Sequence, residues 1–326
     1  MAPEMTDRSP REHRRGGTGA FAPPARHGLV LTVAVLVCCA VVLALCWSSW
    51  SGAQERLAGL TARGVGTVTE VGVAGADGTV RVRWAPAGGP GRDLDVRLGG
   101  AVPPVGSRTE IAYDPADPAR ATVPGSALIV GANRALTDAF CVAVVALGVL
   151  ALGGLRWGLA AAAVRRRPRT TAVRRVRIQA GLLSRSWLET EHEPRRWIPV
   201  HFDPVLVTLP APATVTLRGD PLRDAWVGAE VDGTRIYPAG RVRASEPRGR
   251  RVDNPMRPDA DTARRARQAT LRRHLLLDAA LVAPAPLVGL FWAYLDGGGI
   301  ASWAGATLIA AVAGLWTGAY RGSDPT

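Results

Sequence analysis

Residues 136–169 read LTDAFCVAVVALGVLALGGLRWGLAAAAVRRRPR, an apolar run that ends in a dense group of arginines. A helix crosses the hydrocarbon core of a bilayer with about 20 consecutive apolar residues. Arginines that directly follow such a run mark its cytoplasmic side. We therefore predict a transmembrane helix over residues 136–157, with its C-terminal end in the cytoplasm. The soluble regions before and after it should then face opposite compartments.

Three further apolar runs have the length of a membrane span. Residues 28–47 carry no charge, and residues 274–295 and 300–320 are separated by a short turn. So short a turn predicts an antiparallel helical hairpin, and Pro284 and Pro286 predict a kink in its first helix. Small residues recur at helical spacing in both helices, which predicts close packing and allows self-association. They are Ala285, Gly289, Ala293, Ala306, Ala310, Gly314 and Gly318.

The basic charge of the chain is carried by arginine alone and is distributed unevenly. There are 40 arginines, no lysine and 27 acidic residues, a formal net charge of +13. Residues 51–134 hold nine arginines against eight acids, whereas residues 165–273 hold 24 against 12. Arginines beside the span ends at 165–169 and 264–273 predict cytoplasmic N- and C-termini. The lysine-free composition is typical of a GC-rich genome, so we expect a multi-pass plasma-membrane protein of an actinobacterium.

The two regions between the spans show the alternation of β-strands. Residues 79–84 alternate cleanly, and Asp77-Gly78 and Asp232-Gly233 are hairpin signals. We predict an α+β membrane protein with four transmembrane helices and two small antiparallel β domains. The extracytoplasmic domain covers residues 51–134, and the cytoplasmic domain covers 165–247. Residues 1–27 are expected to form a flexible cytoplasmic tail, and 248–273 a basic linker that ends in a juxtamembrane helix.

One stretch of the first β region resembles a known family. Gly64-Val-Gly-Thr-Val68 opens one strand and Val80-Arg-Val-Arg-Trp84 forms another, and Gly106 leads to Ile111-Ala-Tyr-Asp-Pro-Ala-Asp-Pro118. The pattern resembles the bacterial membrane-protein family called domain of unknown function 3592 over about residues 60–125. The resemblance implies a small β domain between two transmembrane helices. It implies no activity.

The basic flanks of the second β region admit two interpretations. They could bind anionic lipid headgroups, or they could set membrane topology without any ligand, and the second interpretation is favoured. No helix-turn-helix and no aromatic RNA-binding pattern accompanies them, so nucleic acid is not an expected partner. The residues concerned are Arg165, Arg166, Arg167, Arg169, Arg264, Arg265, Arg267, Arg272 and Arg273.

Asp278 is the one ionisable residue expected well inside a span. Such residues are functional candidates by default because an isolated charge is costly in lipid. Arg156, near the inner end of the second span, could pair with it across helices. Asp278 also lies only one helical turn from His274, so it could simply reach the interface.

No recognised catalytic or metal motif is present in the sequence. Cys38, Cys39, Cys46 and Cys141 all lie in apolar runs, and Glu189, Glu191, His192 and Glu193 favour a solvated hairpin end over a metal site. Ser51-Gly52-Ala53 leaves signal-peptide cleavage open as a minor alternative.

We therefore expect no cofactor and no metal. The predicted function is that of a non-enzymatic envelope scaffold or interaction protein, which binds lipid and a protein partner of unknown identity. One alternative is a membrane enzyme, or the regulatory subunit of one, with an unrecognised site. The other is a small transporter component that uses Asp278 and Arg156.

Overall fold

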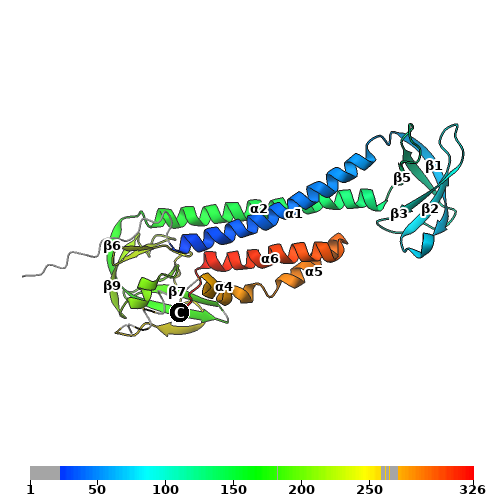
Figure 1. Cartoon of the computed structure of the whole chain (residues 1–326). Coiled ribbons are helices and arrows are strands. Elements are labelled where there is room, and N and C mark those ends of the chain that lie inside the picture. The colour runs from blue at the N-terminus through cyan, green and yellow to red at the C-terminus, as the bar shows by residue number, and fades with distance from the viewer. Residues whose placement is uncertain (1–22, 182, 258–260, 262–263, 265–270) are drawn as a thin grey trace, which may run out of the picture.

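The computed structural model describes residues 23–181, 183–257, 261, 264 and 271–326. Helices occupy the middle of an elongated molecule, and a β module lies at each end (Figure 1). The described part contains five α-helices and two curled antiparallel sheets. The predicted α+β class with two antiparallel β regions is thus confirmed. The predicted basic helix before residue 271 and Arg265 and Arg267 lie outside the described residues, as does most of the N-terminal tail.

Three described helices are long and apolar enough to cross a membrane: α1 (Pro23–Leu57), α2 (Ala127–Ala163) and α6 (Gly299–Arg321). Between α2 and α6 in the sequence, α4 (Leu271–Asp278) and the 3-10 turn η3 (Ala279–Leu281) precede α5 (Ala285–Asp296). The axes on the two sides of the break at residues 282–284 differ by 52°. Pro284 and Pro286 lie at the break, so the predicted kink is confirmed. The pair would make a fourth span if it crosses as one unit.

The first two helices are much longer than the last. At 1.5 Å per residue, the 35 residues of α1 extend about 52 Å and the 23 residues of α6 about 34 Å. Gly28 packs against Tyr320 and Gly305 lies near Val42, so residues 28–47 of α1 run beside α6. The remainder of α1 and the first turns of α2 project past the α5–α6 hairpin toward the first sheet (Figure 1).

We call this projection the stalk; it comprises residues 48–57 of α1 and 127–133 of α2. The stalk corrects the expectation that a soluble domain begins at residue 51 and that the second helix begins at 136. No proline or helix-breaking pair interrupts α1 before Gly59, which has a φ of 88°. The guanidinium of Arg120 then donates to the carbonyl of Ala58 over 3.0 Å, and it satisfies one of the free acceptors at the end of the helix.

The helices pack through an apolar core with few polar atoms. Leu31, Val35 and Cys39 of α1 meet Val142 and Val149 of α2 and Trp316 and Tyr320 of α6. The small residues of the hairpin work as predicted: a Cβ on Gly289 would lie 2.0 Å from Thr307 Oγ1, and one on Gly314 would lie 2.5 Å from the carbonyl oxygen of Leu281. These two glycines are therefore occupied in packing within the chain.

The first β module is a five-stranded sheet of order β3-β2-β1-β4-β5. Val80, Val82 and Trp84 point into its core, while the intervening Arg81 and Arg83 point outward and pair with Asp95 and Asp93 across the strand pair. The alternation read in residues 79–84 is thus confirmed. The strands are β1 (Ala62–Val71), β2 (Thr79–Trp84), β3 (Arg92–Arg97), β4 (Arg108–Tyr113) and β5 (Ala121–Thr122).

The second β module has seven strands in the order β11-β10-β9-β6-β7-β8, with β12 also paired to β6. Its longest strand, β6, begins inside the arginine group for which lipid binding and topology setting were the two interpretations. β12 lies in the stretch expected to be a linker, and this expectation is wrong because residues 250–253 pair with residues 176–179. The strands are β6 (Pro168–Ala180), β7 (Leu183–Thr190), β8 (Trp197–Val200), β9 (Ala213–Arg218), β10 (Gly228–Val231), β11 (Thr234–Ile236) and β12 (Arg250–Asp253).

Candidate functional site

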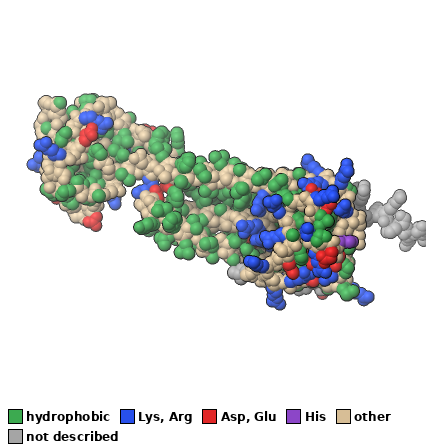
Figure 2. Space-filling model, turned by 180° about the vertical axis from the view of Figure 1, so that it is seen from behind, with side chains coloured by type: hydrophobic (Ala, Val, Ile, Leu, Met, Phe, Trp, Pro, Cys, Tyr) green, Lys and Arg blue, Asp and Glu red, His purple; other side chains and the backbone are tan. Residues whose placement is uncertain are grey.

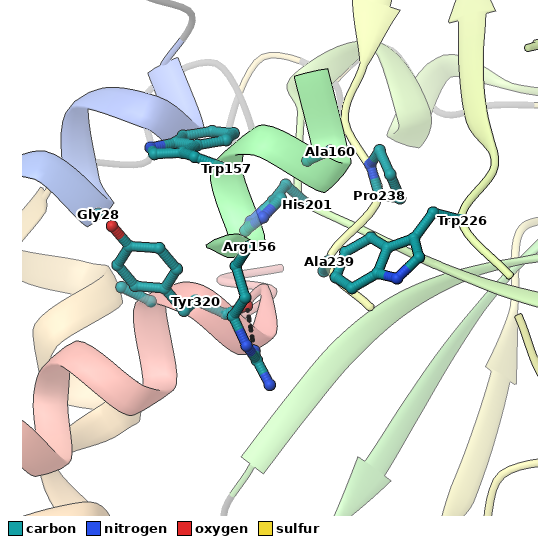
Figure 3. A pocket seen from close by; sticks show the side chains of 10 residues that line it. Gly28, Arg156, Trp157, Ala160, His201, Trp226, Pro238, Ala239 and Tyr320 are labelled. Atoms are coloured by element: carbon teal, nitrogen blue, oxygen red, sulfur yellow. Dashed lines mark hydrogen bonds between the residues drawn. The ribbon is translucent and has the colours of Figure 1, made fainter. Parts of the chain in front are cut away.

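Several buried polar residues lie where the helices meet the second β module. We call this region the junction; it comprises Arg156 and Trp157 of α2, His201 after β8, Tyr320 of α6 and residues 323–326, which follow α6. Figure 3 shows the side chains of Arg156, Trp157, His201 and Tyr320 converging around a small cavity of about 10 Å³. Such a cavity has room for about one water molecule. The junction is therefore built for contact between elements rather than for a large ligand.

Arg156 binds the end of α6. Its guanidinium donates a hydrogen bond to the carbonyl oxygen of Tyr320 over 3.2 Å (Figure 3). The neighbouring indole of Trp157 lies 5.8 Å from the His201 ring and 5.6 Å from the Tyr237 ring, measured between centroids. α2 thus contacts both α6 and the second sheet with two consecutive side chains. In the described part of the chain no ion pair links Arg156 to Asp278, so the cross-helix pair that the sequence allowed is not formed there.

His201 is buried at the centre of the junction, with 8% of its surface exposed. Its backbone amide donates to the carbonyl of Tyr237 over 3.0 Å, and this bond fixes the chain just after β8. Burial, together with smaller effects of the nearby His27 and Arg156, lowers the pKa of His201 from 6.5 to about 4. The imidazole is therefore neutral at physiological pH. The rings of His27 and His274 pack edge to face beside the junction, with 5.1 Å between their centroids. Three of the five histidines of the chain therefore lie in or beside the junction.

Residues 323–326 add an edge contact to β7. The amide of Asp324 donates to the carbonyl of Ser184 over 2.9 Å. The backbone of Ser323 forms an antiparallel β-bridge with the backbone of Arg185. The Asp324 carboxylate accepts from Arg175 over 2.7 Å and from the Ser186 hydroxyl over 2.6 Å. The Arg175 and Asp324 side chains are only 5% and 0% exposed. Through this pair, the end of the helical bundle is anchored inside the second β module.

The protonation of Asp324 follows from these contacts. Burial on its own raises the pKa of a carboxyl, because it disfavours the charged form. Here the Arg175 cation and the hydrogen bonds from Ser186 and Thr326 outweigh burial and hold the pKa of Asp324 below its ordinary value. The pair is therefore ionic at neutral pH. Arg177 adds a bond to the carbonyl oxygen of Thr326.

Asp278 lies beside the same segment. It is 1% exposed, and both of its carboxylate oxygens accept from the Ser323 hydroxyl, over 2.5 and 2.7 Å. Gly318 leaves room for this carboxylate, since a Cβ there would lie 2.6 Å from the Asp278 carboxyl carbon. Asp278 thus binds the residue that precedes Asp324. It fixes the direction in which the chain leaves α6.

The predicted basic residues are only partly available for a ligand. Arg166 pairs with Asp224 over 2.7 Å and Arg169 pairs with Asp220 over 3.2 Å, both within the second module. Arg264 pairs with Asp261 over 2.9 Å. Four remaining members have exposed side chains and no ion pair among the described residues: Arg165, Arg167, Arg272 and Arg273.

The acidic hairpin end is engaged in ion pairs as well. Glu189 is buried and pairs with Arg251 over 2.5 Å and with Arg195 over 3.3 Å, and Glu191 pairs with Arg174. Within the described residues, no group of three or more His, Cys, Asp or Glu side chains could hold a metal ion. Glu189 and Glu191 are thus partners of arginines on β6 and β12 and of Arg195 just before β8, whereas His192 and Glu193 are exposed.

Comparisons with protein-family models, with curated proteins and with solved structures found no match for this chain. The resemblance of residues 60–125 to the domain family therefore stays a prediction. The site that sequence reasoning missed is the Arg175–Asp324 pair. Its two members are 149 residues apart, and neither belongs to a motif.

Proposed function

We propose that this chain is a non-enzymatic scaffold of the bacterial plasma membrane that displays one β module on each side. Four spans, counting the bent α4–α5 pair as one, place the first module outside and the second inside. Both termini are then cytoplasmic. The partners are anionic membrane lipids and a protein bound by one of the modules.

Exposed aromatic side chains on α1 and α5 support the placement of the helices in a membrane. Trp47 and Tyr294 are 66% and 83% exposed, as expected of aromatic side chains in the interface. Figure 2 shows a band of apolar side chains along the helices and charged side chains concentrated over the modules. The arginines beside the ends of α2 and α4 lie toward the second module, which favours the cytoplasm for that side.

The observation that carries the scaffold role is the double attachment of the second module. The chain enters this module from α2, and the segment after α6 returns to it and is buried through Asp324. A module held at two points by buried contacts keeps a fixed orientation to the helices. Such rigidity suits a platform for a partner.

The transporter alternative has less support from the geometry. A carboxylate that carries an ion or a proton across a membrane needs access to both sides. Asp278 instead lies next to the end of α6, with both oxygens bonded to Ser323. Asp278→Asn should therefore rescue a deletion strain as well as the parent chain does. Failure of that rescue, with normal protein levels, would favour transport.

Reporter fusions test the proposal directly. Gly89 and Gly233 lie in exposed turns of the first and second modules. Alkaline phosphatase inserted at Gly89 should be active, and green fluorescent protein inserted at Gly233 should fluoresce. A cytoplasmic signal from Gly89 would contradict the arrangement. Crosslinking of the full-length chain in cells, with either module deleted in turn as control, would then show which module holds the protein partner.

A further inference from the structure

A second concavity lies on the other face of the β6–β7 hairpin, away from the Asp324 contact. It has a volume of about 410 Å³, within the usual range for small-molecule sites. Ile178, Leu183 and Trp187 line its apolar side, and Arg185, Arg243 and Arg248 line its basic side. We call these six residues the arginine pocket. Ile178 lies opposite Arg185 and Val176 lies opposite Trp187 in the β6–β7 pair, so these side chains share one face of the sheet.

The three guanidinium groups of the pocket have no acidic partner among the described residues. This contrasts with Arg166, Arg174 and Arg251 in the same module, each of which forms an ion pair. Glu246 also lines the pocket, but its carboxylate is bonded to Arg251 over 3.0 Å. The Arg243 guanidinium lies 5.4 Å above the Trp187 ring, a cation–π contact that holds it over the pocket.

The environment of Arg185 shows the excess of positive charge. Burial lowers the pKa of Arg185, and the neighbouring cations Arg321, Arg243 and Arg156 lower it further, against only Asp278 in the other direction. Like charges brought together in a partly buried site repel one another, and a bound anion relieves that repulsion. The pocket is thus electrostatically suited to an anion.

The position of the pocket beside the apolar helices indicates which kind of anion can reach it. The backbone of Arg185 forms a β-bridge with Ser323, which lies two residues beyond the last residue of α6. The side chain of Arg185 is also close enough to Arg321 for the two positive charges to interact. The pocket therefore lies near the ends of α4 and α6, where the apolar helices give way to the second module. Figure 2 shows basic side chains gathered at this boundary.

We propose that the arginine pocket binds the phosphate of an anionic glycerophospholipid. Arginine forks match phosphate oxygens in bidentate geometry, and the indole with two aliphatic side chains suits the glycerol backbone beside the phosphate. The location at the inner leaflet rests on the proposed membrane orientation; the phosphate chemistry does not.

Binding of a monomeric lipid tests the proposal without a bilayer. The full-length chain in an uncharged detergent is titrated with dihexanoyl phosphatidylglycerol in a calorimeter, with dihexanoyl phosphatidylcholine as the zwitterionic comparison and glycerol phosphate as the soluble one. Arg185→Gln with Arg243→Gln should weaken phosphatidylglycerol binding about tenfold or more, since each arginine near lipid contributes appreciably. Arg223→Gln with Arg235→Gln removes the same charge from exposed positions outside the pocket and should leave the affinity unchanged.

Equal losses in the two double variants, or no loss in the pocket variant, would overturn the proposal. Arg248→Gln serves as a pocket variant that should fold normally, because this side chain is exposed. It should weaken binding severalfold and leave the midpoint of thermal unfolding unchanged. Glycerol phosphate that binds as tightly as the lipid would keep the phosphate site but assign it to a soluble ligand. Failure of the binding test leaves the orientation untouched, because the reporter fusions measure that separately.

Discussion

The two β modules have similar strand chemistry but are attached to the helices in different ways. The first module continues from the stalk at Leu57 and Ala127, and its charged side chains pair across exposed strand faces. The second module is entered from α2 and is also joined to the segment after α6 by a buried ion pair. The first module therefore depends on the stalk for its position, whereas the second module is also fixed to the helices by a buried contact between residues far apart in the sequence.

The largest expected effect comes from breaking the buried attachment of the second module. Asp324→Ala leaves the Arg175 cation buried without its partner, which should cost about 3–5 kcal/mol of stability. The measurement is thermal unfolding of the detergent-solubilised chain, together with protease cleavage within the second module. Arg175→Met combined with Asp324→Leu should recover most of the loss, because neither charge then remains buried. If Asp324→Ala unfolds like the parent chain, the double attachment has no energetic basis.

The next largest effect is expected from the pH dependence of the stability of the second module, which contains the buried His201. The folded pKa of His201 is about 4 and its ordinary value is 6.5, so between these values the unfolded state binds a proton that the folded state does not. The stability due to the neutral histidine is complete above pH 6.5 and decreases as the pH falls toward 4, by about 3 kcal/mol in total.

The matched variants isolate this residue from other titrating groups. His201→Phe should flatten the pH dependence of the unfolding midpoint between pH 6.5 and 4.5, since an aromatic ring remains beside Trp157. His192→Gln changes an exposed histidine of the same module and should leave the dependence as it is. Parallel curves for the parent chain and His201→Phe would exclude His201 as the source of the acid sensitivity.

A smaller effect is expected from the helix packing that holds the junction together. A Cβ at Gly314 would lie 2.5 Å from the backbone oxygen of Leu281, so Gly314→Ala must push η3 away from α6 at a cost of about 1–3 kcal/mol. Gly305→Ala on the same helix places its Cβ 3.8 Å from Val42 and should be neutral or slightly stabilising. Equal midpoints for the two variants would argue against close packing at Gly314.

The smallest effect should come from the first module. The hydrogen bond from Arg83 lowers the pKa of Asp93, and the one from Arg81 lowers that of Asp95, so these pairs stabilise the sheet at neutral pH and lose that effect as the pH falls through the lowered values. Both pairs are exposed and are screened by salt. Asp93→Asn with Asp95→Asn should barely move the unfolding midpoint at physiological salt. A loss as large as that from Asp324→Ala would remove the contrast between the modules.

Features with a local pattern could be predicted well from the sequence. The kink at Pro284 and Pro286, the strand at residues 79–84 and the close approach at Gly289 follow from ring geometry, from alternation and from the absence of a side chain. β6 was missed because arginines occupy both of its faces and hide the alternation. On one face, Arg175 is buried against Asp324, and on the other, Arg174 pairs with Glu191.

Sequence by itself determined the apolar helices, the break in the hairpin and the two β regions, because each is a repeat of neighbouring residues along the chain. Tertiary structure alone decided where the polar residues meet. Arg175 and Asp324, or Arg185 and Arg243, are brought together by strand pairing and by the return of the chain after α6. The sequence pattern around a charged side chain is the same whether the side chain faces solvent, forms a buried ion pair or lines an anion-binding pocket. Only the position of its neighbours in the fold distinguishes these cases.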